Sequence, residues 1–275
     1  MKRLFTEVQR WLCGVSDQAP QGHALRRLNN LSGFVCGMIR KGSSHLPEIG
    51  SGLPQNINSN SKTVAAKRFV KNKWTDYEVH YLPFLEAFLR GIIGLTPVGE
   101  GLRIVIDGSQ TGKDNAALMV SLVWQNRGIP ICWLVKKGSK GHFKEENHVQ
   151  VLEHASQIIF PIVPKGMPVT ILGDGEFDGI EVQKLCLNNG WNYVLRTACN
   201  TVLYENGERF QARTIEADSE QHCTFIPSVE FTEKRFQFVN FLCWHDKKNM
   251  SNQFSWLVIF KTQETLSNTM INAIR

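Results

Sequence analysis

The chain has 275 residues, of which 42% are hydrophobic and 20% charged, and its formal net charge is +6. This composition excludes an intrinsically disordered chain, and the length allows one large domain or two smaller ones. No apolar run approaches the roughly 18 residues that a membrane-spanning helix needs, and the N-terminus lacks the apolar core of a signal peptide. With seven cysteines and no C-x-x-C pair, the sequence predicts free thiols in a soluble, cytoplasmic protein.

The positive charge is concentrated in the first third of the chain. Residues 1–98 contain 13 Lys and Arg against 6 Asp and Glu, whereas residues 99–275 contain 18 against 19. A basic segment of this kind favours an anionic partner, with nucleic acid the commonest, and a solvated basic surface is the alternative.

The first 98 residues are predicted to be helical. Apolar residues on one helical face predict a helix from Leu4 to Leu12 that Gly14 ends, and a second from Leu25 to Ile39. Residues 43–61 are rich in Ser, Gly, Pro and Asn and predict a loop or a pair of short turns. A further helical segment carries the basic residues that are expected to contact DNA: Lys67, Arg68, Lys71 and Lys73.

After residue 98 the pattern changes to strands. Three apolar runs (102–106, 116–124 and 129–135) precede a helix, a fourth strand at 169–172, a helix and a fifth strand at 193–196. Because a helix separates the third and fourth strands, the fourth can lie parallel to the first. Residues 201–260 form a β-rich block in which Asn206-Gly207 predicts a tight hairpin. The sequence therefore predicts an α/β fold with a mixed sheet, preceded by a helical region.

Asp-Gly pairs follow the first and fourth of these strands, at Asp107 and Asp174. If the two strands are neighbours, the two carboxylates share one edge of the sheet, where they could hold the divalent cations used in phosphoryl transfer. Two ordinary Asp-Gly turns are the alternative. A P-loop, an EF-hand and a zinc site built on His142, His148 and His154 fail on spacing or on missing ligands, so these histidines are interpreted as surface or packing residues.

The segments "RIVIDGSQTGKDNAALMVSLVWQNRGIPICWLVKKG" and "VTILGDGEFDG" resemble the catalytic core of the DDE transposases of bacterial insertion sequences, in particular the insertion-sequence-four group. The resemblance implies an RNase H-like core at 99–275 with a β-strand insertion at about 199–260, after a DNA-binding region at 1–98. It also implies that Asp107 and Asp174 bind Mg²⁺ or Mn²⁺, that the partners are the transposon ends and target DNA, and that the reaction is end cleavage followed by 3′-hydroxyl strand transfer. Homodimer formation stays open.

The third acid of that family, a glutamate in a Tyr-x2-Arg-x3-Glu-x6-Lys signature, has no match, and Glu264 lacks the neighbouring Tyr and Arg. The hypothesis is therefore a transposase truncated at its C-terminus. Two other interpretations stay open: a catalytically inactive protein that binds transposon ends, or inhibits an intact enzyme, and an RNase H-like nuclease that uses another acid.

Two further groups are expected near the DNA. The lysines after the third strand could hold phosphates or could simply be solvated: Lys136, Lys137 and Lys140. A tryptophan of the insertion could stack on a flipped base; Trp244 and Trp256 are the candidates, and a place in the core is the favoured interpretation of each.

Overall fold

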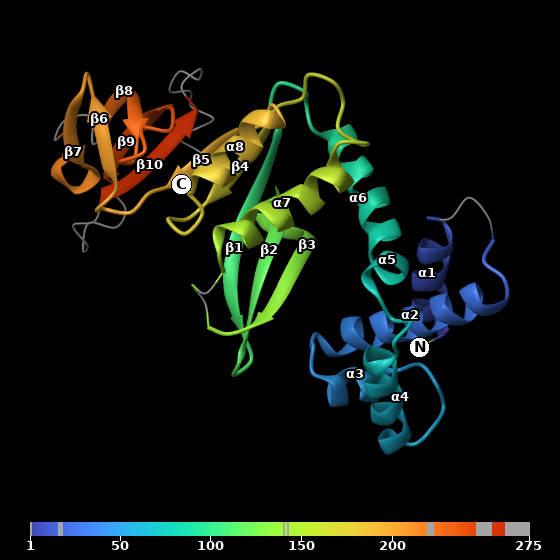
Figure 1. The fold of residues 1–275 in the computed structure, drawn as a ribbon. Coiled ribbons are helices and arrows are strands. Elements are labelled where there is room, and N and C mark those ends of the chain that lie inside the picture. The colour runs from blue at the N-terminus through green and yellow to red at the C-terminus, as the bar shows by residue number, and fades with distance from the viewer. Residues whose placement is uncertain are drawn as a thin grey trace. The chain divides into compact units, whose positions relative to one another are not determined.

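A computed structural model describes residues 2–15, 19–139, 141, 143–218, 223–245 and 255–261. The chain divides into two compact units, Met1–Gly91 and Ile92–Arg275, and the division falls within a helix. The first unit is helical and the second is built on a sheet (Figure 1). Within the described ranges, no helix is both long enough and apolar enough to cross a bilayer.

The described part of the first unit consists of helices, the last of which continues into the second unit: α1 (Lys2–Cys13), α2 (Gly22–Lys41), α3 (Leu46–Gly52), α4 (Ser59–Lys71), α5 (Tyr77–His80) and α6 (Leu82–Leu95). The first two predicted helices are confirmed. Gly42 ends α2 in the left-handed region at φ 58°, and its N–H donates to the carbonyl of Met38 at 2.8 Å. Glycine adopts this backbone conformation without steric cost, which is why it stops the helix here.

The predicted loop at 43–61 is partly wrong, because it contains α3 and the start of α4. The glycines that look like helix breakers allow close helix packing instead. A Cβ on Gly37 would lie 2.5 Å from the carbonyl oxygen of Ile49, and one on Gly50 would lie 2.7 Å from Cα of Thr63. Helices α2, α3 and α4 therefore approach one another at distances that no larger residue would permit.

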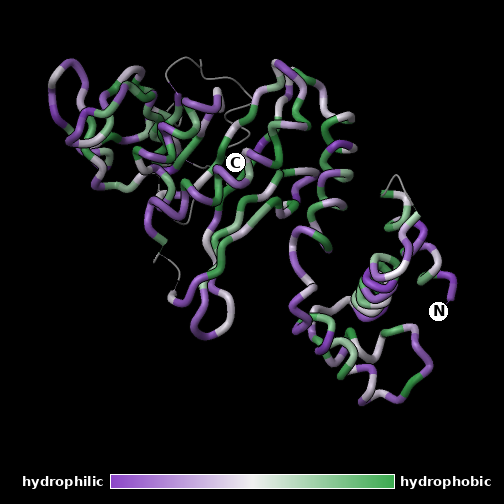
Figure 2. The backbone as a smooth tube through the Cα atoms, turned by 45° about the vertical axis from the view of Figure 1, so that its right-hand side comes forward, coloured by the Kyte–Doolittle hydropathy of each residue, from purple (hydrophilic) through white to green (hydrophobic). Residues whose placement is uncertain are grey.

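The described residues of the second unit form a sheet of ten strands in the order β3-β2-β1-β4-β5-β10-β9-β8-β6-β7 (Figure 1). In chain order the strands are β1 (Leu102–Thr111), β2 (Asn115–Trp124), β3 (Arg127–Lys137), β4 (Val169–Gly173), β5 (Asn192–Arg196), β6 (Val202–Glu205), β7 (Glu208–Gln211), β8 (Cys223–Phe231), β9 (Phe238–His245) and β10 (Ser255–Lys261). Many residues within these strands are hydrophobic (Figure 2).

The pairing of the first five strands is RNase H-like. Strands β1, β2 and β3 are antiparallel neighbours, and β4 and β5 then pair parallel to β1 and β4. Helix α7 (Glu145–Ile159) provides the crossover and packs on β2 and β3, and α8 (Ile180–Asn188) connects β4 to β5. This pairing confirms the predicted α/β fold with a mixed sheet. A helix between the antiparallel and the parallel strands makes the crossover possible.

Tight turns join two pairs of antiparallel strands, and the one at Asn206-Gly207 was predicted. Gln125 and Asn126 join β2 to β3 with φ values of 47° and 61°, and Asn206 and Gly207 join β6 to β7 with φ values of 52° and 88°. Two successive positive φ values give the twist that antiparallel hairpins need.

The β-rich block is confirmed as strands β6 to β10, and it extends the core sheet instead of forming a separate one. Strand β10 pairs antiparallel with β5, with Ile259 opposite Leu195. Val194, Leu242, Val258 and Phe260 form a buried cluster across this junction. The hydrophobic core is therefore continuous from β5 into the block.

Candidate metal and nucleic-acid site

Asp107 and Asp174 each directly follow the last residues of β1 and β4 that pair with each other. The parallel pairing of β1 and β4 ends with Ile106 opposite Gly173, and each aspartate is the next residue. Neighbouring strands are about 4.8 Å apart, so the two carboxylates start from adjacent positions. The predicted pairing of the first and fourth strands is thus confirmed.

The expectation that the first strand ends at Asp107 is wrong. Strand β1 continues to Thr111 because β2 remains paired with it, and Asp107 stands opposite Met119. Strand β4 ends at Gly173, so its pairing with β1 stops at Ile106. Asp107 is consequently exposed and held by a continuing strand, whereas Asp174 is half-buried in a turn.

Hydrogen bonds orient both carboxylates. The Ser109 hydroxyl donates to Oδ2 of Asp107 at 3.4 Å, and the backbone N–H of Glu176 donates to Oδ1 of Asp174 at 3.1 Å. The backbone N–H of Phe177 donates to the Asp174 carbonyl at 3.0 Å, which closes the turn.

Sequence reasoning missed three more acids around this edge. The Glu176 carboxylate lies next to β1, 3.6 Å from where a Cβ on Gly108 would stand. Glu145 at the start of α7 accepts a 2.7 Å bond from the N–H of Glu181. Burial raises the pKa of the Asp178 carboxyl, and the nearby Glu145 carboxylate acts in the same direction, whereas a hydrogen bond from Thr197 opposes it. Only the fold brings Glu145 here.

The described ranges contain no group of three or more His, Cys, Asp or Glu side chains arranged to hold a metal ion. The two aspartates therefore form a pair of donors and not a complete protein cage. Mg²⁺ commonly uses one or two carboxylates and takes its other ligands from water and phosphate.

His148 is a packing residue, as the sequence analysis interpreted it. It is 3% exposed, and its ring lies 4.8 Å from the ring of Phe177 in an edge-to-face contact. Burial lowers the pKa of the imidazole, although the Glu145 and Asp174 carboxylates act in the opposite direction. His148 thus supports the turn that carries Asp174. His142 lies outside the described residues.

The expected DNA contacts of the first unit are exposed. Lys67, Arg68 and Lys71 lie in the last turns of α4, at spacings that place their side chains close together on the helix. Lys73 lies beyond the helix end at Asn72, so its place on the predicted helical segment is wrong. Its ammonium group stands 5.0 Å from the centre of the Trp74 ring.

Lys136 and Lys137 are exposed at the end of β3, not after it as expected, because β2 pairs with them. The row Asp107–Met119 continues to Trp133 on β3, so Lys136 lies three residues, or about 10 Å, further along the strand. Lys140 lies outside the described residues.

The tryptophans of the second unit differ in their burial. Trp244 packs against the buried cluster that contains Val194 and Phe260, which supports a core role. The side chain of Trp256 lies outside the described residues. Trp133, which the sequence analysis did not consider, is 41% exposed in the row of Asp107.

No protein-family model matches the chain, and no curated protein matches it either. Among solved structures, the catalytic domain of human Endonuclease V has 10% identity over 69% of this chain and 86% of its own, with a TM-score of 0.36. Ciona intestinalis Endonuclease V, in complex with an inosine-containing DNA, has 13% identity over 72% and 88%, with a TM-score of 0.36. Marinitoga piezophila Argonaute, in complex with guide RNA and target DNA, has 16% identity over 66% and 26%, with a TM-score of 0.26. Similarities below a TM-score of 0.5 do not establish a function, and the fold assignment rests on the strand order.

Proposed function

We propose that this chain carries the catalytic core of a DDE-type transposase. It would cleave transposon ends in a metal-dependent reaction and transfer the 3′ hydroxyl into target DNA. The observation that supports the proposal most directly is that Asp107 and Asp174 each follow the last residue pair of the parallel strands β1 and β4. The Asp-Gly-Ser and Gly-Asp-Gly motifs that contain these residues are the ones that resemble the transposase family.

The donor set fits a divalent cation. Asp107 is exposed, Asp174 is half-buried, and both offer carboxylate oxygens at one sheet edge. These oxygens suit Mg²⁺ or Mn²⁺, which leave further coordination positions for water and phosphate. When bound, such an ion neutralises charge on the phosphate that reacts.

The protein's own residues orient this edge and attract DNA. Ser109 and the N–H of Glu176 hold the two carboxylates, and glycines beside them leave room for a nucleic-acid backbone. Lys136 and Lys137 are exposed on β3, and Lys136 lies about 10 Å along this strand from the row that contains Asp107. Both lysines can pair with DNA phosphates there. The basic helical unit supplies further sequence-independent attraction.

The test uses Asp107→Ala and Asp174→Ala, with Asp114→Ala as the matched control. Asp114 is an exposed aspartate at the β1–β2 turn. The DNA is a plasmid that carries the flanks of the coding sequence. Because the third acid of the family has no match among these residues, we expect only weak cleavage and strand transfer with Mg²⁺ or Mn²⁺ for the unaltered chain and the control, and loss of both for the other two variants. Equal activity in all three variants would overturn the proposal.

Two observations favour the other candidates. The lack of a three-donor group in the described ranges favours a protein that occupies transposon ends without cleaving them. The position of Glu176 beside Gly108 favours a nuclease that recruits this acid. Metal titration separates them: a binder keeps its DNA affinity without metal and cleaves nothing, whereas a nuclease cleaves without strand transfer and loses activity on Glu176→Gln.

A further inference from the structure

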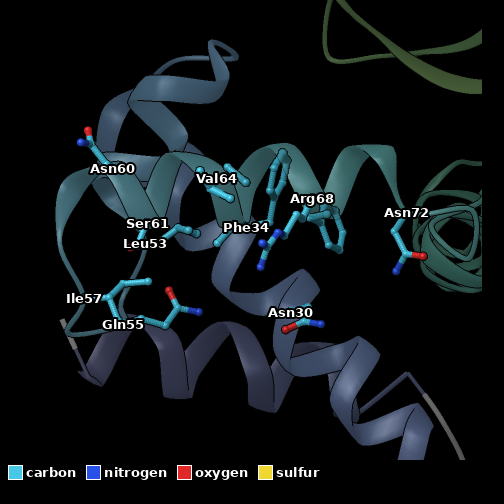
Figure 3. Close-up of a pocket in the computed structure, with 13 residues that line it drawn as sticks. Asn30, Phe34, Leu53, Gln55, Ile57, Asn60, Ser61, Val64, Arg68 and Asn72 are labelled. Atoms are coloured by element: carbon cyan, nitrogen blue, oxygen red, sulfur yellow. The ribbon is translucent and has the colours of Figure 1, made fainter.

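The first unit contains a pocket of about 540 Å³ between α2, residues 53–57 and α4 (Figure 3). Its size falls in the range of about 300–1,000 Å³ that is typical of small-molecule sites. The pocket lies next to the exposed basic residues Lys67 and Lys71 of α4.

Helix α4 supplies one long wall of the pocket. Asn60, Val64 and Arg68 are spaced four residues apart, so they line up along one face, and Asn72 follows at the end of the helix; all four are exposed. Figure 3 shows Arg68 reaching from α4 into the space between this helix and α2, on which Asn30 lies.

The walls combine apolar surface with exposed edges. The ring of Phe34 stacks on that of Phe69, with centroids 4.7 Å apart. Ile57 and Val64 line the pocket and are 46% and 44% exposed. Branched apolar side chains with such a large exposed fraction, inside a concave site, favour a ligand that has a flat apolar face.

The polar part of the lining is rich in carboxamides and carries a positive charge. Asn30, Gln55 and Asn60 each offer a hydrogen-bond donor and an acceptor, as base edges require. Among the described residues of the lining, Arg68 is the charged one and none is an acid. A ligand that matches this lining has a flat ring, a mixed hydrogen-bonding edge and a negative charge.

We propose that this pocket binds one unstacked nucleotide of DNA. The base lies against Phe34 and Val64, its edge bonds to Asn30 and Gln55, and its phosphate pairs with Arg68. The pocket is concave, so a base can enter it only after it has been flipped out of the DNA duplex. A base that is still paired inside the duplex cannot reach the pocket. Lys67 and Lys71 hold the neighbouring phosphates. This inference rests on the proposed function only in taking DNA as the partner.

Three short duplexes of one sequence test the inference by fluorescence anisotropy with the full chain and no metal: fully paired, with one unpaired adenine, and with an abasic site at that position. We expect the unpaired base to raise affinity roughly 10-fold over both other duplexes. Asn30→Leu should remove this preference without changing the salt dependence. Gln21→Leu, an exposed carboxamide outside the pocket, should keep it.

Equal binding of the three duplexes, or a preference that survives Asn30→Leu, would overturn the inference. Absence of all DNA binding would also overturn it, and would point to a peptide as the occupant. The ratio between duplexes is measured without cleavage. The pocket proposal can therefore be wrong while the proposed metal-dependent transposition is right. The opposite result, a nucleotide-binding pocket in a protein without transposition activity, can also be observed.

Discussion

Glu145 accepts a 2.7 Å hydrogen bond from the backbone N–H of Glu181, so the first residue of α7 caps the first turn of α8. The two residues are 36 positions apart. The contact fixes the crossover helix to the helix that follows the Asp174 turn. Gly179 makes it possible, because a Cβ there would lie 2.1 Å from Oε1 of Glu145.

Gly179→Ala should therefore displace the Glu145 carboxylate and leave the Glu181 N–H without its cap. We expect the free energy of unfolding to fall by about 1–2 kcal/mol in urea denaturation. Gly175→Ala is the matched control in the same loop, since its Cβ would meet nothing closer than 3.7 Å. Equal stability of the two variants would show that the cap contributes nothing.

Asp178 predicts a pH dependence of stability. Burial raises the pKa of its carboxyl above the ordinary value of 3.8. A raised folded-state pKa contributes stability that is fully present below the unfolded-state pKa and is lost as the pH rises through the folded-state pKa. Asp178→Asn carries no charge, so its stability relative to the unaltered chain should increase from acid pH toward neutrality, as measured by urea denaturation without metal.

Thr197 supplies the companion experiment. Its hydroxyl donates a 2.6 Å bond to Oδ2 of Asp178, which favours the ionised carboxylate. Thr197→Val removes this bond and should enlarge the loss of stability as the pH rises. A pH profile that neither substitution changes would contradict the assignment.

The basic end of α4 predicts a salt dependence. Lys67→Gln with Lys71→Gln should weaken binding to all duplex sequences and lower the slope of log affinity against log salt by about 1.8, since each phosphate contact contributes about 0.9. Lys165→Gln is the matched control, an exposed lysine just before β4. If the double variant keeps the original slope, these lysines are solvated and do not contact DNA.

Two tryptophans of the sheet, Trp244 and Trp133, should separate stability from binding. Trp244→Ala removes packing on the Val194 cluster and should cost about 2–4 kcal/mol of unfolding free energy. Trp133→Ala at an exposed position should cost less than about 1 kcal/mol. If DNA passes over the sheet at the row that contains Asp107, Trp133→Ala should also weaken the binding of single-stranded DNA roughly five-fold. Both effects are read by denaturation and anisotropy, and the reverse pattern would place Trp133 in the core.

Local signals in the sequence determined much of this protein. The turn at Asn206-Gly207 and the helix between β3 and β4 depend on residues close together in the chain. These elements therefore formed as predicted. The adjacency of Asp107 and Asp174 also followed, because a crossover helix permits parallel pairing of the strands that carry them.

Tertiary packing decided the rest. Asp107 lies inside β1 because β2 offers partners beyond it, and α3 exists because Gly37 and Gly50 admit neighbouring backbone. Glu145 reaches Gly179, and Asn30 and Arg68 share a pocket, through contacts between residues 34 and 38 positions apart. Such contacts depend on how whole elements pack, and side-chain packing has no local signature in the sequence.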